Sequence, residues 1–140
     1  NAKAIETASN FEIHACTDIT GFGILGHALE MAKGSGVQIE LDYTRLPFYP
    51  NALEMYQQGE TTGSNQANRK LADGFWKMVH SISLAEEELL FDPQTSGGLL
   101  LSLPAAQADD LSAALKEAAV DTAARVGQVV GGGKPFVKVV

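Results

Sequence analysis

Cysteine is almost absent from this 140-residue chain: Cys16 is the single example, so no disulfide can form within it. A lone cysteine fits a reducing compartment, and we therefore expect a cytoplasmic protein. Cys16 has neither a CxxC partner nor a nearby basic residue other than His14. We expect it to be a small buried residue rather than a nucleophile.

Positive charge is also scarce. The chain has 10 Lys and Arg residues against 17 Asp and Glu, which gives a formal net charge of −7. No basic stripe is present, and this argues against binding to nucleic acid through phosphate neutralisation. A polyphosphate would have to be held by metal ions, backbone N–H groups or another chain. Long apolar runs are missing too: none approaches the roughly 20 residues that a membrane helix requires, so we expect no membrane association.

The remaining composition is that of a globular domain. Hydrophobic residues make up 45% and charged residues 19% of a chain long enough to bury a core. We expect one domain over residues 1–140 with an α+β fold, in which α-helices pack on a mixed β-sheet. Residues 3–9 have helical composition without a preceding N-cap, which suggests that the chain is a piece of a longer protein.

Periodicity predicts the positions of the main strands. Val37–Tyr43 alternates apolar and polar residues and predicts a strand with one buried face. The apolar run 99–103, a helix beginning near Pro104 and the segment 125–130 predict a strand–helix–strand unit. Its crossover should be right-handed, which gives the fold partial ferredoxin-like character. Residues 136–140 are expected to add an edge strand.

Two other segments give local predictions. Leu84–Phe91 is predicted to be a helix whose acidic residues form a solvated face. This helix should stop at Asp92, because the residue before Pro93 resists the α region. The polar segment 59–68 fits either a mobile connection or a ligand-contacting loop, and the sequence favours the former.

The stretch Cys16–His27, CTDITGFGILGH, places an acidic residue before a glycine-punctuated turn and an amphipathic helix from about Gly21 to Lys33. The first N–H groups of a helix have no partner within the helix, and the helix dipole favours an anion there. Thr20 has the residue type of an N-cap. Gly21 and Gly23 lack the side chains that would keep a ligand away from these N–H groups.

Asp18 lies two residues before Thr20 and can aim its carboxylate at the same point. A carboxylate beside a phosphate is repulsive unless a cation lies between them. Magnesium, held by one or two carboxylates, phosphate oxygens and waters, is the usual solution. The simpler alternative is that Asp18 and Thr20 only cap the helix and the glycines only turn the chain.

The three histidines, His14, His27 and His80, are too dispersed for a metal pair on one helix. His14 is expected to be partly buried and hydrogen-bonded, and His27 to lie at the edge of the core. The chain has no Ser/His/Asp triad at recognisable spacing, no H-E-x-x-H motif and no Walker A lysine loop. Residue chemistry alone therefore indicates an α+β domain with one anion-plus-metal site.

Two stretches, His14–His27 (HACTDITGFGILGH) and Asp92–Leu100 (DPQTSGGLL), resemble the two signatures of the C-terminal half of the selenophosphate synthetases, or selenide, water dikinases. They occur in the order and at the spacing of that family, and the resemblance covers essentially the whole chain. It implies the fold of an AIR synthase C-terminal domain. It also implies an ATP-dependent enzyme that converts ATP, selenide and water to selenophosphate, phosphate and AMP.

The resemblance further implies a homodimer of two-domain chains, with ATP and its Mg²⁺ ions bound between the halves. Asp18 would then be a metal ligand, which agrees with the chemistry argued above. The residues that would shape the phosphate and metal pocket are Thr17, Thr20, Gly21 and Gly23. The segment Gly63–Asn68 matches a family segment only loosely. For Asp92–Gly98 we expect a structural turn that braces the first motif, with no chemical role.

The departure from the family pattern is equally informative. The glycine-rich segment with a reactive Cys or selenocysteine, and most of the metal-binding aspartates, belong to the N-terminal ATP-binding half, which is absent here. We therefore assign no catalytic residue to this chain and expect it to be inactive alone. Two alternatives remain. One is the C-terminal domain of a paralogous ATP-dependent enzyme of purine synthesis or hydrogenase maturation, and the other is a non-catalytic interaction module.

Overall fold

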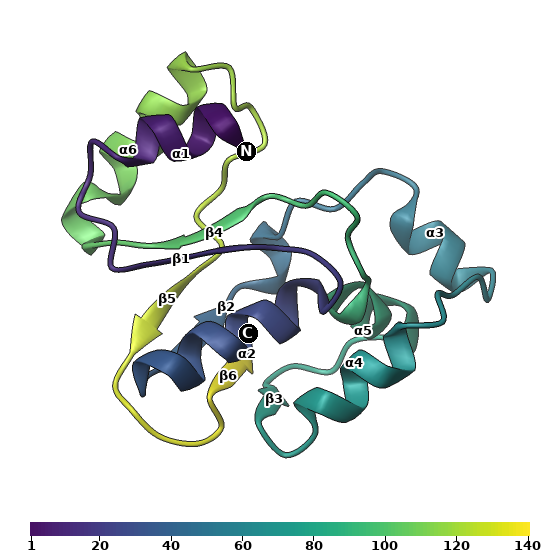
Figure 1. Ribbon diagram of the computed structural model, residues 1–140. Coiled ribbons are helices and arrows are strands. Elements are labelled where there is room, and N and C mark those ends of the chain that lie inside the picture. Colours follow the sequence, from purple (N-terminus) through teal and green to yellow (C-terminus); the bar gives the residue numbers. More distant parts are fainter.

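The computed structural model describes residues 1–140 and contains both helices and mixed sheets (Figure 1), so the predicted α+β class is confirmed. The helices are α1 (Ala2–Ala8), α2 (Gly23–Ser35), α3 (Ala52–Gln57), α4 (Asn65–Ala72), α5 (Leu84–Phe91) and α6 (Ala108–Glu117). The strands are β1 (Ala15–Asp18), β2 (Gln38–Leu41), β3 (Trp76–Met78), β4 (Leu99–Ser102), β5 (Gly127–Val130) and β6 (Val137–Val139). None of these helices combines the length and the hydrophobicity of a transmembrane segment.

The strands form two separate sheets. β1 and β4 make an antiparallel ribbon, and the other four strands form a mixed sheet in the order β3-β6-β2-β5. β4 and β5 therefore lie in different sheets, and the predicted strand–helix–strand unit within one sheet is wrong. The reason is that β5 pairs antiparallel with β2, a strand far away in sequence. Apolar periodicity identifies strands but does not select their partners.

The C-terminal strand β6 is another correction. It runs parallel to both β2 and β3 and is an interior strand, not the edge strand that we predicted. Val137 and Val139 are completely buried, and Lys138 lies 3.7 Å from the Glu40 carboxylate across the sheet. A three-residue strand with one charged residue has the composition of an edge, and only the tertiary pairing shows otherwise.

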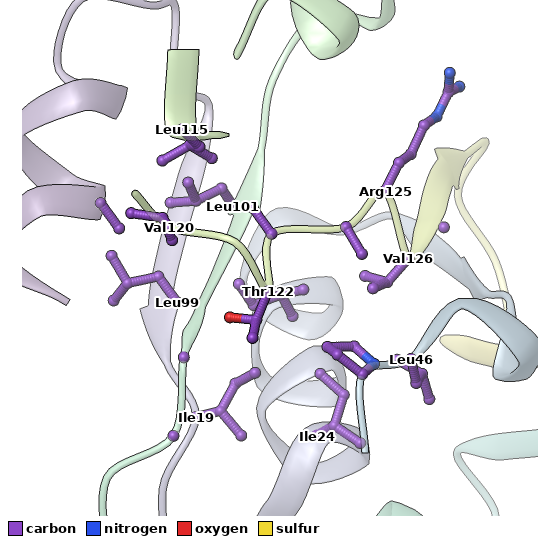
Figure 2. A pocket seen from close by; sticks show the side chains of 18 of the residues that line it. Ile19, Ile24, Leu46, Leu99, Leu101, Leu115, Val120, Thr122, Arg125 and Val126 are labelled. Atoms are coloured by element: carbon purple, nitrogen blue, oxygen red, sulfur yellow. The ribbon is translucent and has the colours of Figure 1, made fainter. Parts of the chain in front are cut away.

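A large cavity of about 1180 Å³ lies between the ribbon and the four-stranded sheet (Figure 2). It is lined mainly by apolar side chains from β4, α6, the four-stranded sheet and the segment 119–126 that leads into β5. Ile19, Ile24, Leu99 and Leu101 are among the lining residues, whereas Asp18 is not. This cavity therefore borders the buried side of the first motif and not its exposed side.

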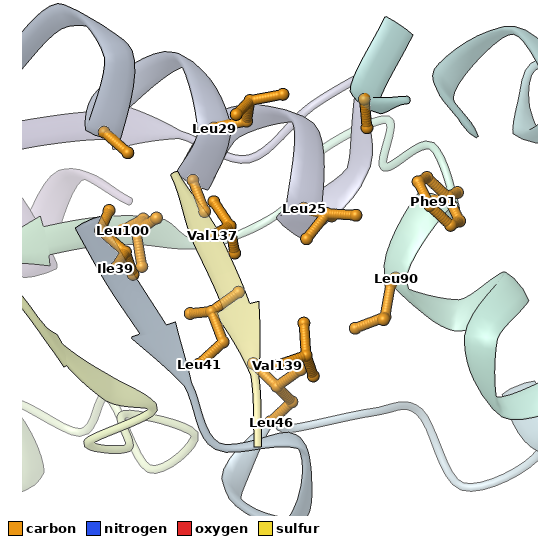
Figure 3. Close-up of a cluster of buried hydrophobic side chains, with 13 residues drawn as sticks. Leu25, Leu29, Ile39, Leu41, Leu46, Leu90, Phe91, Leu100, Val137 and Val139 are labelled. Atoms are coloured by element: carbon orange, nitrogen blue, oxygen red, sulfur yellow. The ribbon is translucent and has the colours of Figure 1, made fainter. Parts of the chain in front are cut away.

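The main core is formed by α2 and α5 against the four-stranded sheet (Figure 3). Leu25, Leu41, Leu90 and Phe91 are buried there with almost no exposed surface. A smaller cluster of Ala8, Leu111 and Leu115 joins α1 to α6, away from the main core (Figure 1). The first motif is thus attached, through Ile19, Ile24 and Leu25, to the larger of the two clusters.

The segment 59–68 differs from its prediction as a mobile connection. Its last residues begin helix α4, in which Asn65 and Asn68 are buried. α5 has the predicted bounds, and Ser83 and Glu86 form a reciprocal capping box at its start. α5 ends before Asp92, as expected for a residue that precedes proline.

Candidate functional site

Asp18 is the last residue of β1 and lies directly across from Leu99 of β4. Side chains alternate along a strand, and Asp18 and Cys16 lie on the exposed face of β1. The Asp18 carboxylate makes no hydrogen bond or ion pair within the chain. The carboxylate predicted to bind a metal is therefore accessible and free.

Thr17 lies on the opposite face of the ribbon. It is paired with the buried Leu100, and its hydroxyl donates to the Asp18 backbone carbonyl oxygen at 3.3 Å. Its side chain cannot lie on the same face as the Asp18 carboxylate, because neighbouring strand residues point in opposite directions. Any contribution of Thr17 to the pocket would come from the face of β1 opposite to Asp18.

Thr20 is not the N-cap of α2, and that prediction is wrong. The helix begins at Gly23, and Phe22 occupies the capping position with no side-chain capping bond. The Gly23 N–H instead donates to the Thr20 carbonyl at 3.1 Å, which closes a turn before the helix. The Thr20 hydroxyl lies 3.2 Å from Nε2 of His27, within hydrogen-bond distance. The hydroxyl is therefore engaged with a later turn of the helix and not with its first N–H groups.

His27 is only 6% exposed, at the edge of the core as expected. Its ring packs 5.5 Å from the Phe22 ring, centroid to centroid. Nδ1 lies 3.2 Å from a Glu30 carboxylate oxygen but makes no hydrogen bond with it. His14, in contrast, is exposed beside Glu12, so the expectation of partial burial is wrong for that histidine.

Gly21 and Gly23 of the first motif have different surroundings. Around Gly21 there is open space, so an approaching group would meet bare backbone there. Gly23 is buried with a φ of +70°, and a Cβ at this position would lie 2.9 Å from the Leu90 carbonyl oxygen. The missing side chain of Gly23 therefore admits the end of α5 and not a ligand, which corrects the reason that we gave for it.

The second motif braces the first, as predicted. The Ile19 N–H donates to the Gly98 carbonyl at 2.9 Å, and the Gly97 N–H donates back to the Ile19 carbonyl at 3.1 Å. The Gln94 N–H donates to the Thr20 carbonyl at 3.0 Å. A Cβ on Gly97 would overlap the Ile19 carbonyl oxygen, so the contact depends on a glycine.

The carboxylate of Asp92 is fully used within the protein. The Tyr56 hydroxyl donates to one of its oxygens, and the Gln94 side-chain amide donates to the other at 2.6 Å. Burial raises the pKa of Tyr56 well above its usual range, and the hydrogen bond to Asp92 adds to this effect. Tyr56 therefore remains a neutral donor at physiological pH. Both oxygens of the Asp92 carboxylate thus serve contacts within the chain, unlike those of Asp18.

A partly buried polar network joins α4 and α5, and the sequence analysis did not predict it. The Asn65 amide donates to the Glu88 carboxylate at 2.7 Å, and Arg69 pairs with both Glu87 and Glu88. The acidic face of α5 is therefore partly engaged rather than simply solvated. Asn65 and Asn68 are three residues apart on a helix, and this spacing could have indicated a common polar face.

Cys16 is exposed, so the predicted burial is wrong. Partial desolvation raises the pKa of its thiol, and the neighbouring negative charge of Asp18 raises it further. A higher pKa means that less of the thiol is ionised at neutral pH, and the thiolate is the nucleophilic form. The expectation that Cys16 is not an activated nucleophile is consistent with this environment.

The chain alone does not complete a metal site. No group of three or more His, Cys, Asp or Glu side chains is arranged to hold an ion. An exposed, unpaired carboxylate is nevertheless a suitable oxygen ligand for Mg²⁺, which commonly takes one or two carboxylates together with phosphate oxygens and waters. A single carboxylate leaves the other coordination positions of such an ion to groups other than His, Cys, Asp and Glu side chains of this chain.

The sequence has relatives among known proteins. Residues 1–140 match the family described as AIR synthase related protein, C-terminal domain. The chain is 43% identical to a selenide, water dikinase of Pelobacter propionicus over 130 residues, 93% of this chain and 37% of that protein. It is 43% identical to one of Treponema denticola over 133 residues, 92% of this chain and 37% of that protein.

A third relative has the same name. The selenide, water dikinase of Clostridioides difficile is 37% identical over 139 residues, 99% of this chain and 40% of that protein. The chain thus spans about two fifths of the length of the curated relatives that it matches. The resemblance inferred from the two signatures is confirmed, and it extends over nearly the whole chain.

Proposed function

Because this chain belongs to the AIR synthase related proteins, as their C-terminal domain, we propose that it is the C-terminal domain of a selenide, water dikinase. The complete enzyme would make selenophosphate, phosphate and AMP from ATP, selenide and water. The N-terminal ATP-binding half would supply the remaining metal ligands and the reactive group. The 140 residues alone would be catalytically silent, because one carboxylate cannot neutralise a transferring phosphoryl group.

One observation carries this proposal: Asp18 is exposed and unpaired at the end of a strand that the second motif braces. When bound, Mg²⁺ would neutralise the phosphate oxygens of ATP. Asp18 would contribute one oxygen ligand to that ion. Thr20 and Gly21 would shape the pocket from the turn that follows Asp18. Thr17 and Gly23 would support this turn from the side that faces the core.

The proposal includes the context of the complete enzyme. It would be a homodimer that works in the cytoplasm and binds neither nucleic acid nor membranes. The names of the relatives favour this selenium enzyme over a paralogue of purine synthesis or hydrogenase maturation. The sequence of the preceding half discriminates among these, because the selenium enzyme is expected to have a Cys or selenocysteine with a nearby Lys there.

The test is selenide-dependent AMP formation by the full-length protein with Asp18→Ala. We expect a loss of about a hundredfold or more, since a metal ion supplies several kcal/mol of charge stabilisation. The melting temperature should hardly change, because Asp18 has no partner to lose. Asp121→Ala, which removes another exposed carboxylate, is the matched control and should retain full activity.

Two results would contradict the proposal. Full activity of the Asp18→Ala enzyme would support the non-catalytic module instead. AMP formation from ATP and selenide by the 140-residue chain alone would show that the preceding half is not required.

A further inference from the structure

Asn68 of α4 is 5% exposed and lies beside the first motif. Its side-chain amide nitrogen donates to the Gly21 carbonyl at 2.8 Å and to the Phe91 carbonyl at 3.0 Å. An amide NH₂ has two hydrogens, so both are used. Asn68 therefore joins the turn that follows Asp18 to the last residue of α5.

The first of these bonds orients a peptide group. In a trans peptide the carbonyl and the next N–H point in opposite directions. Because Asn68 draws the Gly21 carbonyl toward α4, the N–H of Phe22 is directed away from α4. That N–H donates to no group of the chain. The space around Gly21 is open, so the backbone of this turn is accessible.

The second bond fixes the distance between the turn and α5. Gly23 already approaches the end of α5 so closely that a Cβ would meet its backbone. The carbonyls in the last turn of a helix lack partners within the helix, and Asn68 satisfies one of them at Phe91. Asn68 thus bridges the turn and the end of α5, in addition to the backbone contact at Gly23.

We propose that Asn68 is a positioning residue: by bonding both the Gly21 carbonyl and the last carbonyl of α5, it sets where the Asp18 carboxylate and the Phe22 N–H meet a metal-bound phosphate. This inference rests on the proposed function. Asn68 itself touches neither metal nor nucleotide, and it acts only through the backbone of the turn.

Asn65 provides a matched control within the same helix. It is 2% exposed, and its amide contacts Tyr56 and Glu88 but no atom of the first motif. Replacing either asparagine with alanine removes a buried side chain of the same size together with its hydrogen bonds. Only the Asn68 replacement releases the Gly21 carbonyl.

The experiment uses the full-length protein with Asn68→Ala, Asn68→Asp and Asn65→Ala. Activity is measured as AMP formation from ATP and selenide at varied Mg²⁺ and ATP, and stability is measured as the melting temperature. We expect kcat/KM to fall about tenfold or more for both Asn68 variants, because small displacements of positioned groups have effects of this order. The Mg²⁺ concentration for half-maximal activity should rise as well. Asn65→Ala should lower the melting temperature similarly while kcat/KM stays within about twofold of the wild type.

Asn68→Asp keeps the volume of asparagine but places a carboxylate oxygen against two carbonyl oxygens. If Asn68→Ala does not fold, the activity of Asn68→Asp tests the inference in its place. The inference is overturned if Asn68→Asp matches the wild type, or if Asn65→Ala and Asn68→Ala lose activity equally. Failure of the proposed function looks different. In that case the wild-type protein makes no AMP from ATP and selenide, or Asp18→Ala is fully active.

Discussion

Asp18 and Asp92 each precede a turn rich in threonine and glycine, yet the structure treats their carboxylates in opposite ways. Asp18 is exposed and has no partner within the chain. Asp92 is half-buried, and both of its oxygens accept hydrogen bonds, from Tyr56 and Gln94. The same residue type is thus available for a ligand in one motif and used to hold the fold in the other.

The comparison shows how the two motifs depend on each other. A free carboxylate near a ligand is useful only if its position is fixed, and Asp18 has no side-chain bond that fixes it. The backbone around it is held instead, through Ile19 and Thr20, by the turn that follows Asp92. The second motif therefore provides the rigidity that the first motif requires.

The largest effect is expected at the contact between the motifs. Gly97→Ala would push a methyl group into the Ile19 carbonyl, and we expect the free energy of unfolding to fall by about 3 kcal/mol. Gly98→Ala, which meets nothing within 4 Å, is the matched control and should cost much less. Urea denaturation measures both. Equal losses of unfolding free energy for the two variants would mean that the close contact between Gly97 and Ile19 does not hold the two motifs together.

The two carboxylates should differ in their effect on stability. Asp92→Ala removes two hydrogen bonds, from the half-buried Tyr56 hydroxyl and from the Gln94 amide, and this should cost about 1–3 kcal/mol in the free energy of unfolding. Asp18→Ala should change that free energy by no more than about 0.5 kcal/mol, because the side chain is exposed and unpaired. A similar cost for both, by the same denaturation assay, would remove the contrast between the motifs.

The smallest effect reports on the charge of Asp18. That charge raises the pKa of the Cys16 thiol. Asp18→Asn should therefore lower this pKa and increase the fraction of thiolate at pH values below the pKa. Alkylation of Cys16 by iodoacetamide at pH 8 should then be roughly twofold faster than in the wild type. Asp92→Asn serves as the control and should leave the rate unchanged. An unchanged rate in Asp18→Asn would show that the two side chains do not interact.

Features encoded locally could be predicted from the sequence. The bounds of α5 follow from Ser83 and Glu86 at one end and from Asp92-Pro93 at the other. The brace between the motifs was also anticipated. Cys16 was expected to be buried because of its residue type, but strand alternation places it outward with Asp18.

Features that depend on how the folded chain packs could not be predicted. The Thr20 hydroxyl had the right chemistry for an N-cap, but His27 lies close enough to engage it. Strand β6 lies in the interior of its sheet only because β2 and β3 flank it. The role of Asn68 depends on a carbonyl 47 positions earlier in the chain. Such contacts depend on tertiary packing, and local sequence patterns do not predict them.

The most direct test of the central claim counts metal ions rather than turnover. Mn²⁺ is substituted for Mg²⁺, and binding to the full-length protein in the presence of ATP is measured by electron paramagnetic resonance. We predict that Asp18→Asn binds fewer Mn²⁺ ions, or binds one of them far more weakly, than the wild type, whereas Asp92→Asn binds the wild-type number with wild-type affinity. Unchanged Mn²⁺ stoichiometry and affinity in Asp18→Asn would contradict the assignment of Asp18 as a metal ligand.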